Sequence, residues 1–286
     1  MSKVDLHVHS NASDGRFSPV EIVRKAAEAG LTIIALTDHD TVDGIIPALE
    51  ASRDFPGLKV LPGVEISTDV PAGEVHVLGF FIDYADPELQ TSLSTMRNSR
   101  QLRAQRMIAK LKGLGMPIDW ERVKEIAGNG AIGRPHIAQA LLEKGYIHSL
   151  KDAFTNFIGR NGPAYVERDK MTPIEAVELI LRANGLPVLA HPLTISDPEA
   201  MIIELSARGL VGIEAYYNGC TPEESGRLVS LAKKYGLLVT GGSDFHGLDA
   251  NTETMLGGAR VPLEAAEKLI ARVKQAVPKP SNKQRL

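Results

Sequence analysis

The chain has 286 residues, of which 43% are hydrophobic and 23% charged, a composition typical of a globular protein with one large domain or one domain and an insert. Its formal net charge of −3 lacks the basic excess of a protein that binds duplex nucleic acid, although a local basic pocket for a phosphate is compatible with it. For the same reason we expect no duplex-DNA partner. Cys220 is the single cysteine, so no internal disulfide can form. Because no apolar stretch approaches membrane-spanning length either, we expect a soluble, cytoplasmic protein with no membrane partner.

Short apolar runs alternate with helical patterns over much of the chain. Several of these runs are nearly continuous in Val, Ile, Leu and Ala, which is typical of parallel strands buried on both faces. The predicted strands are Val4–His9, Thr32–Asp38, Lys59–Ser67, Val75–Ile82, Pro187–His191, Val211–Tyr217 and Leu237–Ser243. About seven strands in a chain of this length favour a barrel over an open sheet.

Three helices between these strands carry the same start signal. In each, a Ser or Thr N-cap precedes a proline at the first helical position and a glutamate that completes a capping box. The signals are Ser18-Pro19-Val20-Glu21, Thr172-Pro173-Ile174-Glu175 and Thr221-Pro222-Glu223-Glu224, and the expected stops are Gly30, Gly185 and Gly236. Strand–helix alternation of this kind predicts a right-handed parallel α/β architecture.

The alternation breaks between about Asp86 and Val166, where only helical patterns follow one another. The predicted helices are Glu88–Leu114, Asp119–Ala127, Pro135–Lys144 and Leu150–Ile158. We interpret residues 86–166 as an all-helical insert that caps the substrate site. The barrel that carries it would consist of residues 1–85 and 167–286.

Six of the eight histidines, together with two acids, lie at or near the ends of predicted strands. They are His7, His9, His39, His76, His191 and His246, with Glu65 and Asp244. Period two places His7 and His9 on one strand face, and Asp244 and His246 on one face if the strand geometry persists that far. Because the carboxyl ends of the strands form the active face of an α/β barrel, these side chains should converge there. Imidazole and carboxylate ligands suit zinc, manganese or iron, so the pattern predicts a metal site.

Three further aspartates stand near this face. Asp14 follows the first strand in a loop that leaves the metal face, so we expect it to be a ligand rather than a turn aspartate before glycine. Asp5 shares the face of His7 and is expected to orient a ligand imidazole rather than to bind a metal ion. Asp38 is expected either to support the ligands in the same way or to cap the following helix.

The order of these motifs resembles that of the polymerase and histidinol phosphatase (PHP) family over nearly the whole chain. The motifs are Asp5-x-His7-x-His9, Thr37-Asp38-His39, Gly63-x-Glu65, His76, His191 and Ser243-Asp244-x-His246. The resemblance implies an α/β fold of the distorted (β/α)7 barrel type and a trinuclear centre of divalent metal ions, with Mn2+ favoured over Zn2+ or Fe2+.

The resemblance also implies how the ligands are shared among the metal ions. One ion would take His7, His9, Glu65 and Asp244, which would together hold a metal-bound hydroxide as the catalytic nucleophile. A second ion would share Glu65 and take His76 and His191. A third ion would take Asp14, His39 and His246.

The helical stretch looks like that of a bacterial subgroup similar to 3′,5′-nucleoside bisphosphate phosphatases, some of whose members are related to 5′-end RNA exonucleases. It contains Gly133-Arg134-Pro135-His136 and Gly159-Arg160-Asn161-Gly162-Pro163. We expect Arg134, His136 and Arg160 to bind a 5′-phosphate that is not cleaved, against the alternative that the arginines make ordinary salt bridges. The expected substrate is a small nucleotide bisphosphate. The alternatives are short 5′-phosphorylated RNA, histidinol phosphate, and a non-catalytic metal-binding module.

Overall fold

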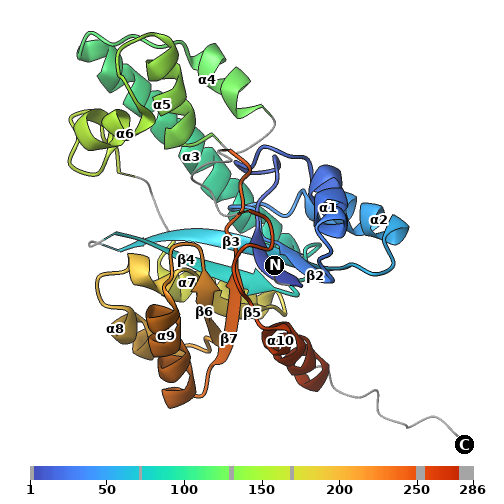
Figure 1. The fold of residues 1–286 in the computed structure, drawn as a ribbon. Coiled ribbons are helices and arrows are strands. Elements are labelled where there is room, and N and C mark those ends of the chain that lie inside the picture. The colour runs from blue at the N-terminus through green and yellow to red at the C-terminus, as the bar shows by residue number, and fades with distance from the viewer. Residues whose placement is uncertain (1–2, 71–72, 129–131, 168–170, 249–254, 277–286) are drawn as a thin grey trace, which may run out of the picture.

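A computed structural model of the chain describes residues 3–70, 73–128, 132–167, 171–248 and 255–276. Its strands form one seven-stranded sheet in chain order (Figure 1). The strands are β1 (Val4–Val8), β2 (Ile33–Leu36), β3 (Lys59–Val70), β4 (Gly73–Phe80), β5 (Leu186–Leu189), β6 (Gly212–Tyr217) and β7 (Leu238–Gly242). The α-helices are α1 (Pro19–Glu28), α2 (Ile45–Ala51), α3 (Pro87–Gly113), α4 (Trp120–Ala127), α5 (Arg134–Glu143), α6 (Leu150–Ala153), α7 (Pro173–Arg182), α8 (Pro198–Ser206), α9 (Pro222–Lys234) and α10 (Leu263–Ala276).

The sheet is mixed, which corrects the prediction that all of its strands are parallel. β1, β2 and β3 run parallel, as do β5, β6 and β7, but β4 is antiparallel to both of its neighbours. Only two residues separate Val70 from Gly73, whereas a parallel pair needs a crossover of about a dozen residues or more. The start of β4 therefore lies at the end of the sheet where the parallel strands finish.

The first and last strands meet and nearly close the sheet into a barrel. Beyond the end of β7, the backbone N–H of Asp244 donates to the His7 carbonyl, and that of His9 donates to the Phe245 carbonyl, both at 2.9 Å. A Cβ at Gly242 would collide with the backbone nitrogen of His7, so this close approach requires glycine. With helices around the sheet (Figure 1), the predicted α/β barrel is confirmed.

The three predicted capping boxes are confirmed. Ser18, Thr172 and Thr221 cap α1, α7 and α9, and each accepts a hydrogen bond from the backbone N–H of the expected glutamate. Gly30 and Gly236 follow their helices with φ of +74° and +67°. At the end of α7 the left-handed position belongs to Asn184, with φ of +58°, and not to the predicted stop at Gly185.

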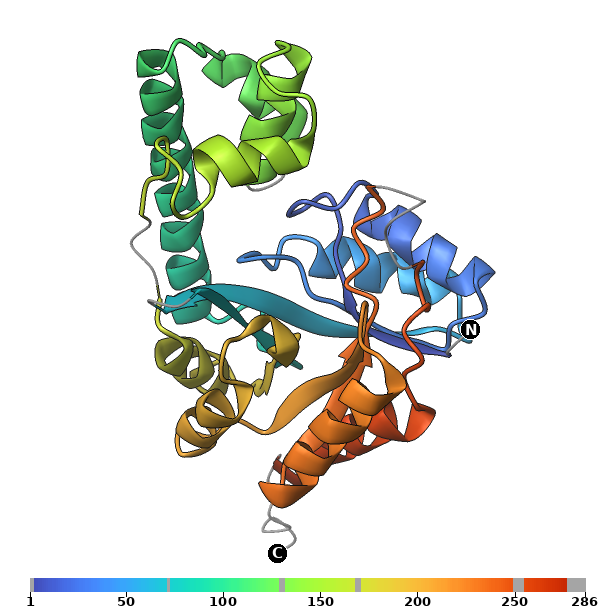
Figure 2. The ribbon, with the colours of Figure 1, turned by 60° about the vertical axis from the view of Figure 1, so that its left-hand side comes forward.

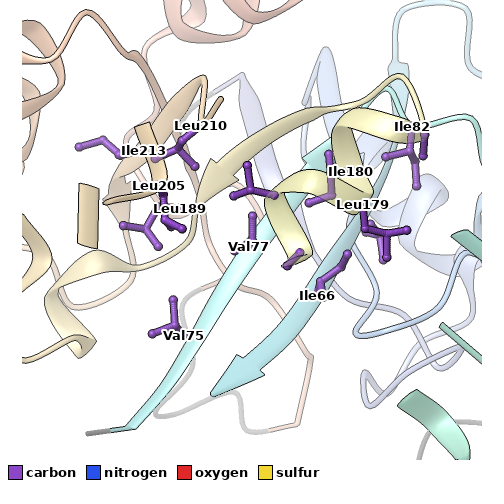
Figure 3. Packing of buried hydrophobic residues seen from close by; sticks show 14 of the residues in the cluster. Ile66, Val75, Val77, Ile82, Leu179, Ile180, Leu189, Leu205, Leu210 and Ile213 are labelled. Carbon is purple, nitrogen blue, oxygen red and sulfur yellow. The ribbon is translucent and has the colours of Figure 1, made fainter. Parts of the chain in front are cut away.

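A hydrophobic core joins the second half of the sheet to the helices α7, α8 and α9. Ile66 on β3 and Val77 on β4 lie beside Leu179 and Ile180 of α7, and Leu189 of β5 pairs with Val77 (Figure 3). Burying one such side chain contributes about 1.5–3 kcal/mol to folding. This packing holds β3, β4 and β5 in place, and these strands carry or precede several of the predicted ligands.

Helices α3 to α6 lie between β4 and α7, and a π-helical turn (Phe154–Ile158) follows α6. They surround a hydrophobic cluster of their own, while α3 links that cluster to the barrel (Figure 2). Leu89 and Leu93 near the start of α3 belong to the barrel core, whereas Met107 and Leu111 near its end belong to the helical cluster. One continuous helix thus contributes to both cores. Among the described residues, none of the helices combines the length and the apolar character needed to cross a membrane.

Candidate metal centre

Glu65 of β3 is fully buried, and four side chains gather around one of its carboxylate oxygens. Its Oε2 atom lies 3.1 Å from His7 Nε2, 3.2 Å from His9 Nε2 and 3.1 Å from His39 Nδ1. Asp244 Oδ1 completes the group, at 3.3 Å from His7 Nε2 and 3.1 Å from His9 Nε2. His7 and His9 thus point to the same side of β1, as period two predicts.

The other oxygen of Glu65 faces a second pair of imidazoles. Its Oε1 atom lies 2.9 Å from His76 Nδ1 and 3.1 Å from His191 Nε2. His76 reaches this place because β4 runs antiparallel and pairs it with Ser67, two residues beyond Glu65. One carboxylate therefore stands between two groups of histidines, which is an arrangement that two metal ions can share.

Asp14 gathers a third group in the loop after β1. His246 Nε2 lies 3.3 Å from Asp14 Oδ1, and His39 Nε2 and His9 Nδ1 lie 3.9 Å from the two Asp14 oxygens. The rings of His9 and His246 stack with their centroids 4.2 Å apart. His9 and His39 thus border this group as well as the group around Glu65 Oε2.

Most of the nitrogen–oxygen separations also match the spacing of ligands around shared metal ions. Ligands about 2.0–2.2 Å from a common ion lie roughly 3.0–3.4 Å from one another. Several buried atoms that face these groups make no hydrogen bond to any described residue: His7 Nε2, both ring nitrogens of His9, Asp14 Oδ1 and Glu65 Oε2. Since buried polar atoms are rarely left unpaired, this donor set fits divalent cations.

The pKa values of the clustered histidines and carboxylates depend on burial and on one another. Burial disfavours a charged His9, but its contacts with Asp244 and Glu65 overcome burial and raise its pKa to about 10. Burial lowers the pKa of His39 to about 3, and the nearby carboxylates do not offset it. Burial also opposes ionisation of Asp14, but neighbouring histidines, His39 first, bring its pKa well below the usual range. A cation in this cluster would stabilise the same ionised carboxylates.

Glu214 of β6 is a buried residue of the site that the sequence interpretation missed. Its carboxylate lies 3.2 Å from His7 Nδ1 and accepts a hydrogen bond of 2.9 Å from the backbone N–H of His191. A carboxylate on the second nitrogen of a ligand imidazole fixes the ring orientation and the tautomer. The available signal was a single charge in the otherwise uncharged strand Val211–Tyr217.

Asp5 and Asp38 are buried, but neither contacts an imidazole in the way predicted for Asp5. Asp5 accepts hydrogen bonds from Ser243 N at 2.8 Å, Ser243 Oγ at 2.6 Å and Gly257 N at 2.7 Å. Asp38 accepts from Ser10 N, Ser10 Oγ and Ser13 Oγ, each at 2.7 Å, and it does not cap α2. Each thus fixes a loop that carries a predicted ligand, either Asp244 or Asp14.

The backbone is strained where two of the predicted ligands stand. Asp244 has φ of +54° and His191 has φ of +27°, a region that residues other than glycine seldom adopt. β7 ends at Gly242, so the strand geometry does not persist to His246. Asp244 consequently faces His7 and His9, whereas His246 faces Asp14. The two side chains therefore do not follow the period-two pattern of a strand.

A cavity of about 180 Å³ lies between the metal-ligand candidates and the helical stretch. Its barrel wall includes Asp14, His39 and His76, all of them predicted ligands. The facing wall comes from α3 and α5 and includes Arg100, Arg103, Arg134 and His136. The helical stretch therefore covers the metal-ligand candidates on this side and contributes basic groups to the space between.

The three predicted phosphate-binding residues have different surroundings. Arg134 lines the cavity and donates to Glu74 Oε1 at 2.7 Å, and His136 lines it with Nδ1 accepting from Gly133 N at 3.0 Å. Arg160 is not among the residues that line the cavity. It donates to both carboxylate oxygens of Asp69 at 2.7 Å, as in the alternative interpretation of a salt bridge. The predicted substrate contact of Arg160 stays a prediction.

Comparison with known proteins gives one consistent family. The profile of the PHP domain matches residues 5–159. The chain is 34% identical to a 5′-3′ exoribonuclease of Haemophilus influenzae over 85% of this chain and 90% of that protein. It is 32% identical to the 3′,5′-nucleoside bisphosphate phosphatase of Chromobacterium violaceum, over 86% and 88% of the two chains.

A solved structure shows the same fold. It belongs to a protein of Bifidobacterium adolescentis assigned as a metal-dependent phosphoesterase, with a TM-score of 0.84, 31% identity, and coverage of 94% of this chain and 96% of that chain. The names of these three proteins all describe action on phosphoesters. The names of the two relatives, however, give different substrates.

Proposed function

The chain belongs to the PHP family of metal-dependent phosphoesterases, and from this premise we propose that it removes the 3′-phosphate of a nucleotide that also carries a 5′-phosphate. The main support is the cavity with metal-ligand candidates on one wall and Arg134 and His136 on the other. The reaction is a hydrolysis: a water oxygen bonds to phosphorus, the bond from phosphorus to the 3′-oxygen breaks, and the departing oxygen takes a proton.

The residues that would hold the divalent ions are the nine that the sequence predicts: His7, His9, Asp14, His39, Glu65, His76, His191, Asp244 and His246. The contacts of Glu65 with histidines on both of its oxygens support a bridging role for this residue. When bound, divalent ions make a coordinated water more acidic and offset the charge on the phosphoryl group.

Arg134 and His136 would hold the phosphate that is not cleaved. Because His136 Nδ1 accepts a hydrogen bond from Gly133 N, the neutral ring carries its proton on Nε2, which is then a donor. Burial lowers the pKa of His136, so the ring favours this neutral form. Arg134 adds a permanent positive charge on the same wall. A substrate with two phosphates about one ribose apart would then contact both walls at once.

A 5′-3′ exoribonuclease is the second candidate, because the relative from Haemophilus influenzae carries that name. Short RNA with a 5′-phosphate presents the same pair of groups, and its first 3′-linkage would be the bond that breaks. Comparing kcat/KM for adenosine 3′,5′-bisphosphate, a 5′-phosphorylated oligoribonucleotide and histidinol phosphate separates the candidates. A value for histidinol phosphate well above both others would contradict the proposal.

The role of Arg134 is tested by changing the enzyme and the substrate together. We expect Arg134→Ala to lower kcat/KM for adenosine 3′,5′-bisphosphate by roughly one to three decades, the range for a lost charged hydrogen bond with its phosphate. Activity on adenosine 3′-monophosphate should hardly change, because that substrate lacks the 5′-phosphate. Arg122→Ala is a matched control, since Arg122 is an ion-paired arginine of α4 that does not line the cavity. Equal losses on both substrates would place Arg134 in the fold or the metal site.

A further inference from the structure

Three arginines line the cavity, and two of them already have a carboxylate partner. Arg100 Nε donates to Asp40 Oδ2 at 2.8 Å, and Arg134 Nη2 donates to Glu74 Oε1 at 2.7 Å. For Arg103, the described residues supply no carboxylate within ion-pair distance. Arg103 is therefore the one arginine of this wall that makes no ion pair with a described acidic side chain.

Arg103 is held firmly by contacts other than ion pairs. Its Nε donates to the Val166 carbonyl at 2.8 Å, and its guanidinium lies 5.1 Å from the centre of the Tyr165 ring. The residue is only 9% exposed, and Nη2 is buried without a hydrogen bond to any described residue. A buried charged donor left unpaired destabilises the protein, unless a ligand supplies the acceptor.

The first turn of α5 lines the same cavity from Gly133 to Ile137. This helix has ten residues, and its N-terminus carries partial positive charge. Helix N-termini are favourable places for phosphate groups. Two independent features thus line one cavity: a helix end, and a buried guanidinium with one donor that makes no hydrogen bond to a described residue.

We infer that Arg103, through Nη2 and beside the N-terminus of α5, binds the phosphate that the enzyme does not cleave. The identity of this ligand rests on the proposed function. Arg103 would contribute more to phosphate affinity than Arg134, because Glu74 already compensates part of the Arg134 charge. The planar guanidinium can hold Val166 with Nε and the phosphate with Nη2 at the same time.

Equilibrium binding to the metal-loaded protein tests this inference without catalysis. The probes are adenosine 5′-monophosphate and adenosine, with dissociation constants measured by calorimetry. We expect Arg103→Met to weaken binding of the monophosphate by about ten- to a hundredfold, the range for a hydrogen bond to a charged group, and to leave adenosine binding unchanged. Arg103→Lys keeps the charge but lacks the second donor arm, so its loss should be smaller.

Arg106→Met is the matched control, because Arg106 lies on α3 one turn further along and is exposed. It should bind both probes as the unchanged protein does. Thermal unfolding shows whether each variant is folded. If Arg103→Met is not folded, the binding measurement uses Arg103→Lys instead. A monophosphate affinity within about twofold of the original in folded Arg103→Met, or in folded Arg103→Lys where Arg103→Met does not fold, would overturn the inference.

The two proposals can fail separately. If the unchanged protein does not hydrolyse adenosine 3′,5′-bisphosphate but binds the monophosphate through Arg103, the proposed function fails and the phosphate subsite stands. If it hydrolyses the bisphosphate and the Arg103 variants keep their monophosphate affinity, the function stands and the subsite is wrong.

Discussion

Glu214 connects two candidate metal ligands that come from different strands. Both of its oxygens lie within 3.3 Å of His7 Nδ1, and Oε2 also accepts a hydrogen bond from the backbone N–H of His191. A carboxylate at Nδ1 favours a proton there, which would leave Nε2 free to bind a metal ion beside Glu65 and Asp244. It also holds His191 in its strained backbone conformation. One buried carboxylate thus sets the orientation of ligands on both sides of Glu65.

We predict that Glu214→Gln lowers metal affinity by about 10- to 100-fold, because an amide holds the His7 ring and the His191 backbone less well than a carboxylate. Titration calorimetry with Mn2+ on metal-free protein measures the change. Glu204→Gln, at an exposed position of α8, is the control and should bind metal normally. Unchanged affinity in a folded Glu214→Gln protein would show that Glu214 serves only the barrel core.

The sequence predicts ligand candidates where their positions follow from local patterns. His7 and His9 share a face by period two, and Glu65 and His191 lie within or directly after short apolar runs. Local patterns do not predict the surroundings of Arg103 and Arg160. Whether an arginine has an acidic partner depends on residues far away in the chain, such as Asp69 for Arg160.

At the scale of elements, the reversed direction of β4 accounts for the position of His76. The rule that ligands follow the carboxyl ends of parallel strands does not apply to a histidine near the start of a strand. Because β4 turns back directly after β3, its first residues lie where the other strands end. Only two residues join the strands, a signal for a hairpin that the apolar pattern of each run did not reveal.

Helices with strong capping signals were predictable, whereas others were left unassigned. α2 is seven residues long and begins at Gly44 without a side-chain cap, so its local signal is weak. α8 has a cap at Asp197 but is only weakly amphipathic, and α10 follows the last strand, outside the strand–helix alternation. α6 gives way to a π-helical turn within the predicted helix Leu150–Ile158, a change of winding that no periodicity predicts.

Because α3 contributes to two hydrophobic cores, a deletion that tests the predicted cap can begin within this helix. Replacing residues 98–166 by a flexible linker keeps Leu89, Leu93 and Met96 in the barrel core. We expect this variant to stay folded and to bind metal, because the candidate ligands all lie outside the segment. It should lose selectivity, so that kcat/KM for adenosine 3′,5′-bisphosphate approaches that for adenosine 3′-monophosphate.

Replacement of residues 87–166 is the comparison for that experiment. It also removes Leu89, Leu93 and Met96, and losing large core side chains costs about 2–5 kcal/mol each, so this longer deletion should be clearly less stable. A folded, metal-loaded protein that lacks residues 98–166 yet keeps its original selectivity would contradict the cap hypothesis.

At the scale of the whole molecule, the candidate metal centre joins most of the barrel's strands. Its residues come from β1, β3 and β4 and from the segments that follow β1, β2, β5 and β7. Several buried carboxylate and imidazole atoms of this centre make no hydrogen bond to a described residue, and such burial disfavours folding unless a cation binds them. Ions that bind only the folded state should therefore stabilise the entire barrel, and their effect should be visible in global unfolding.

Removing the ions with a chelator should abolish activity and lower the melting temperature. Purified protein should carry about two to three divalent ions per chain by elemental analysis, as expected for a multinuclear phosphoesterase site. Each site filled at about 100 times its dissociation constant adds roughly 2.7 kcal/mol, which corresponds to a shift of several degrees in a protein of this size. Mn2+ added back should restore both properties in the unchanged protein. It should restore them poorly in Glu65→Gln, because this change affects the groups on both sides of the carboxylate. Protein with less than one tightly bound ion, full activity in chelator and an unchanged melting temperature would exclude the metal centre, whatever the substrate.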